Sequence, residues 1–233
     1  MTSVLDALRC DADEALSREA IRVYRRYQEE IVESLNLCPW AERTRLEGRV
    51  QERVVLTRAL ELGAALHAVE GLAADPAIEI GLLLFPLATT TMTAFERFVS
   101  RLSAAEVERH PIGTAPFAMA AFHPDAQPDL ADAERLIPFL RRTPDPTIQL
   151  VRCASLERVR EGFQEGTAFV DINAIAARVV TSEDTLPLRT RLARANEKTV
   201  RRVGVAELER RFGDITRDRN AAYARLPLRA PRT

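Results

Sequence analysis

Two side chains suited to nucleophilic and acid–base chemistry stand beside prolines in this sequence. Cys38 precedes Pro39 within the segment Asn-Leu-Cys-Pro-Trp-Ala, and His123 precedes Pro124 within Phe-His-Pro-Asp. Proline fixes φ and removes a backbone donor, so a loop that carries a reactive group beside it keeps one shape. A thiol becomes a nucleophile when a base deprotonates it, and an imidazole can do this near neutral pH. We therefore predict Cys38 as a catalytic thiolate and His123 as its base.

A third proline-rich segment adds groups that bind anions. Arg-Thr-Pro-Asp-Pro begins at Arg142 and leads into an apolar stretch that ends at Arg152. A guanidinium presents a planar fork of donors that matches a carboxylate or a phosphate. We predict that Arg142 and Arg152, with Trp40 and Asp125, bind a small anionic substrate.

Other interpretations of the same residues stay open. Cys38 or His123 could be the ligand of a haem or another iron centre, because a Cys-Pro pair turns the chain away from a bound iron. The motifs could instead fix the loops of a non-catalytic binding or assembly protein. In that case Cys38 is a small buried hydrophobe, and the arginines pair with the nearby carboxylates Asp145 and Glu157.

Composition excludes several classes of chemistry. The 233 residues are 46% hydrophobic and 29% charged, with a net charge of −1 and no stretch long and apolar enough to span a membrane, which is typical of a globular cytoplasmic protein. Three cysteines and three histidines lack the spacing of a zinc site or a disulfide framework. The single lysine, Lys198, follows no glycine-rich loop, and no Gly-x-Gly-x-x-Gly occurs, so we expect neither pyridoxal phosphate nor a nucleotide.

Hydrophobic periodicity predicts an α/β or α+β fold with helices packed on a roughly four-stranded mixed sheet. The apolar residues recur with helical spacing or form short buried runs. Helices are predicted over residues 17–35, 59–74, 93–108 and in a patch within 129–140, and strands over 50–56, 78–85, 117–122 and 147–153. Residues 42–49 are expected to be an arginine-rich link. His123 and Arg142 then lie at strand ends, where functional groups gather.

The charge balance changes near residue 181. Residues 181–233 hold 13 basic and 7 acidic residues, against 20 and 27 before them. We divide the chain into an α/β core domain, 1–180, and a basic C-terminal arm, 181–233, with an amphipathic helix that stops at Gly213-Asp214. We expect this helix to pack on the core or to form a homodimer, and nucleic-acid binding is not expected because aromatic residues do not alternate with the charges.

The three motifs together resemble the bacterial family called domain of unknown function 1415. Members carry Asn-Leu-Cys-Pro-aromatic-Ala after a first helix, here 36–41, and Phe-His-Pro after a strand, here 122–124. An Arg-x-Pro-x-Pro stretch then runs into a strand that ends in arginine, here 142–152. The resemblance covers roughly residues 20–165. It implies a shared set of residues but no particular reaction.

The chain departs from the family pattern at three positions. Gln149 stands where members often have histidine, Cys153 follows the strand arginine where glutamate is common, and Trp40 replaces phenylalanine. The first two changes remove ionisable groups. They predict a subfamily whose chemistry does not depend on that histidine or glutamate.

Overall fold

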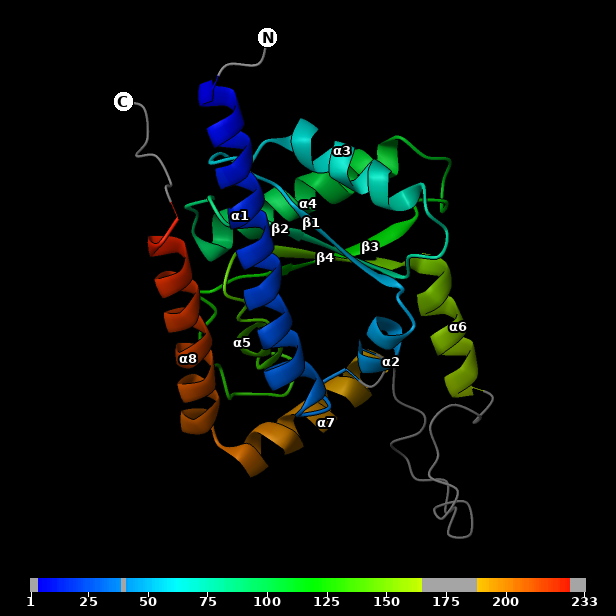
Figure 1. The fold of residues 1–233 in the computed structure, drawn as a ribbon. Coiled ribbons are helices and arrows are strands. Elements are labelled where there is room, and N and C mark those ends of the chain that lie inside the picture. The colour runs from blue at the N-terminus through cyan, green and yellow to red at the C-terminus, as the bar shows by residue number, and fades with distance from the viewer. Residues whose placement is uncertain (1–3, 39–40, 165–187, 227–233) are drawn as a thin grey trace.

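A four-stranded mixed sheet forms the centre of the computed structural model, which describes residues 4–38, 41–164 and 188–226 (Figure 1). The strand order is β1-β2-β4-β3. β1 is parallel to β2, and β4 is antiparallel to both of its neighbours. The bounds are β1 Val50–Val54, β2 Ile80–Leu84, β3 Phe117–Phe122 and β4 Thr147–Arg152.

The sequence predicted helices packed on the sheet, and the structure shows them on both of its faces (Figure 1). The helices before β4 are α1 Val4–Tyr27, the π-helix η1 Gln28–Glu33, α2 Ala41–Leu46, α3 Leu62–Ala73, α4 Met92–Glu108 and α5 Ile137–Leu140. Those after it are α6 Cys153–Gln164, α7 Leu188–Val203 and α8 Val205–Ala224. The prediction of a link over 42–49 was wrong in part, because this segment contains most of the short helix α2. The apolar residues of α2 are too few to show helical periodicity in the sequence.

Alternation along the strands divides the core into two layers. Leu82 and Leu84 of β2 pack toward α1 and α8, whereas Leu83 between them packs toward α3 and α4. All three are essentially inaccessible to solvent, which explains why this strand is an unbroken apolar run. A β-carbon on Gly81 would lie 2.7 Å from Leu72 of α3, so glycine allows that helix to approach the sheet closely.

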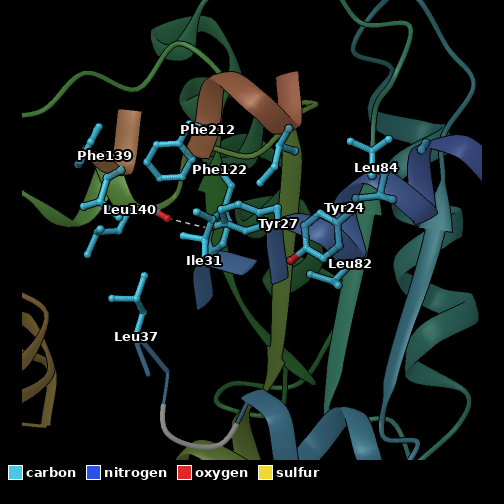
Figure 2. Packing of buried hydrophobic residues seen from close by; sticks show 14 of the residues in the cluster. Tyr24, Tyr27, Ile31, Leu37, Leu82, Leu84, Phe122, Phe139, Leu140 and Phe212 are labelled. Atoms are coloured by element: carbon cyan, nitrogen blue, oxygen red, sulfur yellow. Dashed lines mark hydrogen bonds between the residues drawn. The ribbon is translucent and has the colours of Figure 1, made fainter. Parts of the chain in front are cut away.

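The layer next to α1 includes aromatic side chains from distant parts of the chain (Figure 2). Tyr27 of α1 stacks against Phe212 of α8 and donates a hydrogen bond of 2.7 Å to the carbonyl of Leu140. Phe139 meets Phe212 edge to face. Burial of each such side chain contributes roughly 1.5–3 kcal/mol, so the C-terminal helix belongs to the core.

The C-terminal helices pack as the predicted amphipathic arm, but their boundary was wrong. The helix does not stop at Gly213, which lies inside α8. The break falls at Gly204, whose φ of 89° ends α7. Helical glycine costs only about 1 kcal/mol, and packing of α8 against α1 offsets it. Asp218 of α8 accepts hydrogen bonds from Arg22 and Arg26 of α1 at this contact.

In the part of the chain that the structure describes, no helix is long and apolar enough to cross a membrane.

Candidate functional site

The Asn-Leu half of the first motif ends a helix. Asn36 has a φ of 50°, a left-handed conformation that asparagine tolerates better than most residues. The Leu37 N–H then bonds the carbonyl of Val32 at 2.9 Å, and the Leu37 side chain is buried beside α1. A polar residue in left-handed conformation followed by an apolar contact is a common way to terminate a helix. Two residues of this motif therefore have a structural role.

Cys38 lies directly after this turn and is half-buried. Its carbonyl accepts the N–H of Ala41 at 3.2 Å, at the beginning of α2. Burial raises the pKa of Tyr24 and Tyr27, and the nearby Cys38 thiol raises it further. Cys38 thus lies on the α1 side of the sheet. Trp40, the predicted substrate contact, lies outside the described residues.

The turn that carries Cys38 is held between η1 and α2 by ion pairs of Arg45 with Glu33 and, at 3.8 Å, with Glu29. Arg45 of α2 donates two hydrogen bonds, of 2.8 and 2.7 Å, to the two carboxylate oxygens of Glu33 at the end of η1. Gln28 donates a third to Glu33 at 3.0 Å. These donors lower the pKa of Glu33. A π-helix is rare and often occurs beside functional residues, and here it immediately precedes the first motif.

His123 is a buried imidazole directly after β3. Its Nδ1 accepts the N–H of Asp125 at 3.2 Å, and its ring lies against Phe95 of α4 at a centroid separation of 5.8 Å. Its Nε2 has no hydrogen-bond partner among the described residues. Burial lowers the pKa of His123, while the Asp125 carboxylate, 3.8 Å from Nδ1, opposes this shift.

The structure does not bring Cys38 and His123 together. Cys38 lies on the side of α1, next to Tyr24 and Tyr27, whereas the ring of His123 packs in the opposite layer, against Phe95. The sheet lies between these layers. The catalytic roles of both residues stay predictions, and in this arrangement the thiol would need another base.

The third motif forms a buried polar contact with α8. Arg142 donates from Nε to the carbonyl of Ala126 at 2.7 Å and lies over the rings of Phe139 and Phe212. Burial lowers the pKa of Arg142. The expected pair between Arg142 and Asp145 is absent, because Arg142 bonds a carbonyl and Asp145 takes a partner from α8.

Asp145 is bound by two side chains that sequence reasoning missed. Arg219 donates to its Oδ1 at 2.9 and 2.7 Å, and the Tyr223 hydroxyl donates to its Oδ2 at 2.6 Å. Asp145 is 2% exposed, so this is a buried charge compensated in full. Burial and the Asp145 charge raise the pKa of Tyr223. The spacing of Arg219 and Tyr223 places them on one face of a helix, a signal that could have identified α8 as carrying a polar contact.

Arg152 lies at the other end of the sheet and lines a surface pocket of about 710 Å³. It is opposite Phe117 in the register, whereas His123 follows Phe122, so roughly 16 Å of strand separates the two ends. Its Nε and Nη2 donate to the carbonyls of Ile78 and Asp75 at 2.7 and 2.8 Å. The predicted pair with Glu157 is not among these contacts. The structure therefore separates Arg152 from His123 and Arg142, which lie at the opposite end of the sheet.

Arginines surround this pocket, which we call the arginine pocket. It is lined by side chains from α2, from the adjoining ends of β2 and β4, and from the first turns of α6. Its charged lining residues are the arginines Arg43, Arg49, Arg152 and Arg158 and the glutamates Glu47 and Glu79. Four positive and two negative charges leave a net charge of +2. Only Arg152 was singled out in the sequence, because the other arginines come from segments without a motif.

Each glutamate of the arginine pocket is shared by two arginines. Glu47 pairs with Arg43 at 2.7 Å and with Arg49 at 3.3 Å. Glu79 accepts from Arg49 and Arg158, both at 2.8 Å. Sharing fixes the guanidiniums in place without neutralising them. Within residues 4–38, 41–164 and 188–226, the two hydrogen bonds of Arg152 go to backbone carbonyls and not to a carboxylate, so its charge adds to the surplus.

Among the described residues, no group of three or more His, Cys, Asp and Glu side chains could hold a metal ion. A haem needs only one protein ligand, so haem ligation by Cys38 or His123 stays a prediction.

The fold and site define an α/β sandwich protein with an arginine-lined pocket at one end of a mixed sheet. A family model described as a protein of unknown function, DUF1415, matches residues 19–187, and the chain belongs to that family. No curated protein and no solved structure matched the chain. The family resemblance deduced from the three motifs is confirmed.

Proposed function

We propose that this protein binds a small anionic molecule, a carboxylate or a phosphate ester, in the arginine pocket. The observation that carries the proposal is the surplus of positive charge there, which four arginines create around two shared glutamates. Guanidiniums that lie close together repel one another, and a bound anion relieves that repulsion. The predicted anion-binding role of Arg152 is part of this function.

Arg152 is suited to hold the ligand. A guanidinium has five N–H donors, and two of them are used by the carbonyls of Ile78 and Asp75. The same group lies over the ring of Phe117, at 4.8 Å from its centroid. These contacts fix the position of the guanidinium and leave donors for a ligand, so little side-chain entropy is lost on binding.

Titration calorimetry with inorganic phosphate and with succinate tests this proposal. Replacing Arg152 with glutamine removes charge-assisted hydrogen bonds worth about 1.5–3 kcal/mol, so we expect affinity to fall roughly ten- to hundredfold. Because Arg152 also anchors the loop before β2, Arg43→Gln serves as a second variant. Arg43 is exposed and pairs with Glu47, one turn away.

Arg101→Gln is the matched control, because Arg101 is exposed on α4 and does not line the pocket. It should bind both anions as the wild type does. Binding that is unchanged in Arg152→Gln and Arg43→Gln, or wild-type protein that takes up neither anion at low ionic strength, would refute the proposal.

The catalytic part of the sequence hypothesis, with Cys38 as thiolate, is a separate prediction. An activated thiol reacts with iodoacetamide near neutral pH faster than ordinary thiols do. Cys10, which is exposed, provides the internal comparison. Preferential labelling of Cys38 would support a nucleophile, and labelling of all three cysteines at equal rates would remove it.

A further inference from the structure

The two edges of the sheet differ in how they are protected. β1 and β3 are the edge strands. β1 carries Gln51, Glu52 and Arg53, and Arg25 of α1 donates to Glu52 at 2.8 Å. Charged side chains and a neighbouring helix are the usual means of preventing an edge strand from pairing with another chain. β1 is thus a blocked edge.

β3 carries no such charges, although α4 packs on one face of the sheet at this strand. Its sequence is Phe-Ala-Met-Ala-Ala-Phe, without a charged residue or a proline, and Ala118 is exposed. A short apolar edge strand with small side chains offers little obstacle to another backbone. The arginine pocket includes no residue of β3, so the two features are independent.

The register shows which backbone groups of β3 face outward. Phe117 is opposite Arg152, and the N–H of Cys153 bonds the carbonyl of Pro116 at 2.9 Å. Because bonding alternates along an antiparallel pair, the even-numbered residues of β3 bond β4. The N–H and C=O groups of Met119 and Ala121 point away from it. Among the described residues, no group bonds these outward N–H and C=O groups.

We propose that β3 pairs antiparallel with β3 of a second copy of this chain. A two-fold axis perpendicular to the sheet keeps the two faces of both copies aligned, which requires odd-numbered residues to lie opposite odd-numbered ones. Met119 and Ala121 meet this requirement and also present the unpaired groups. Two copies of β3 are therefore complementary in the orientation of their side chains and in their backbone hydrogen bonds. The pairing brings no like charges together.

A second copy is favoured over a strand from another protein for this reason of self-complementarity. The pairing joins two four-stranded sheets into one continuous sheet and hides both open edges at once. The small side chains of Ala118 and Ala120 face the α1 side, where bulky residues would hinder approach.

Light scattering coupled to size exclusion, across a concentration series, tests the dimer. We expect wild-type protein to reach twice the 26.0 kDa of one chain. Ala118→Lys places a long charged side chain at the new strand pair and should return the mass to that of one chain. Ala121→Pro removes an outward N–H without breaking the bonds to β4, and it should act in the same way. Gln51→Lys, on the blocked edge β1, is the matched control and should stay dimeric.

Amide hydrogen exchange provides the second measurement. The amides of Met119 and Ala121 should be protected in the dimer and exchange fast in the monomeric variants. Wild-type protein that is monomeric at every concentration would overturn the proposal. So would a dimer that persists in both β3 variants, which would favour the homodimer predicted through the C-terminal helix. Protection of these two amides in a monomer would also overturn it.

Discussion

The two ends of the sheet differ in whether their charged side chains are compensated by charges of opposite sign. At the end where β3 stops, Asp145 is 2% exposed and is bonded by Arg219 and Tyr223. At the end where β4 stops, arginines lie around an open pocket with more positive than negative charge. A buried, fully compensated charge stabilises one arrangement of the chain, whereas an accessible, uncompensated one can bind a ligand. On this basis we propose a structural role for the first end of the sheet and recognition of an anion at the second.

The same comparison explains why proline-rich motifs can mislead. The Asp145 motif looks reactive in the sequence because it places ionisable groups in a rigid loop. In the fold the carbonyl of Asp145 accepts hydrogen bonds from the hydroxyls of Thr143 and Thr147. The carboxylate of Asp145 accepts a hydrogen bond from Arg219 of α8. A rigid loop is as useful for a tertiary junction as for catalysis.

The largest expected effect is at the buried junction. Asp145→Asn should lower the free energy of unfolding by about 3–5 kcal/mol, because it leaves the Arg219 charge without its carboxylate. Chemical denaturation measures this change, and Asp11→Asn, at an exposed site in α1, is the control. A loss no greater than that of the control would contradict a structural role for this end of the sheet.

Tyr223→Phe should have a smaller effect at the same junction. It removes one hydrogen bond of 2.6 Å to the Asp145 carboxylate and keeps the ring that lies below Arg219. We expect a loss of about 1.5–3 kcal/mol in the same denaturation experiment. The double variant with Asp145→Asn should lose less than the sum of the two single variants, because both remove the same contact. Strict additivity would show that the hydroxyl and carboxylate act separately.

Protonation of His123 should weaken the fold as the pH falls. Burial lowers the pKa of His123 in the folded protein below its ordinary value of about 6.5. The unfolded chain therefore binds the proton more readily than the folded protein does. The stability that the neutral His123 ring contributes is present above about pH 6.5 and is lost as the pH decreases below that value. His123→Gln should flatten this dependence below about pH 6.5. His67→Gln, at a side chain that is 91% exposed, should leave the slope unchanged.

The smallest effect on stability is expected at the arginine pocket. Glu47→Gln removes an exposed carboxylate shared by Arg43 and Arg49, and unfolding should be unaffected. Affinity for phosphate should rise at low salt, because the pocket becomes more positive, and the gain should disappear at high salt. Weaker phosphate binding in this variant would indicate that Glu47 orients the arginines rather than offsetting their charge.

Local patterns were sufficient to predict most of the fold. The apolar run ending at Leu84 and the helical spacing around Phe98 depend only on neighbouring residues, and both elements occur where expected. The predicted end of the C-terminal helix at Gly213 was wrong, because a glycine tolerates helical conformation when tertiary packing supports it. Gly204, with its positive φ, carries the break.

The candidate site depends on contacts that no local pattern contains. Asp145 and Arg219 are 74 positions apart, and Arg49 and Arg158 meet only at Glu79. Cys38 and His123 each occur in a distinctive motif, yet the face of the sheet on which each lies is a property of the whole fold. Arg152 was recognised because it ends a strand, but the other arginines of the pocket come from α2, from α6 and from the residue before β1, which carry no such signal.

Backbone amide chemical shifts during a titration with inorganic phosphate test the central claim most directly. The account predicts shifts at Arg49, Ile80, Arg152 and Ser155 around the arginine pocket, with the amides of His123 and Thr143 unmoved. Shifts concentrated at His123, Asp125 and Thr143, with a silent arginine pocket, would contradict it. That result would place the anion site at the end of the sheet where β3 stops, beside His123 and Arg142.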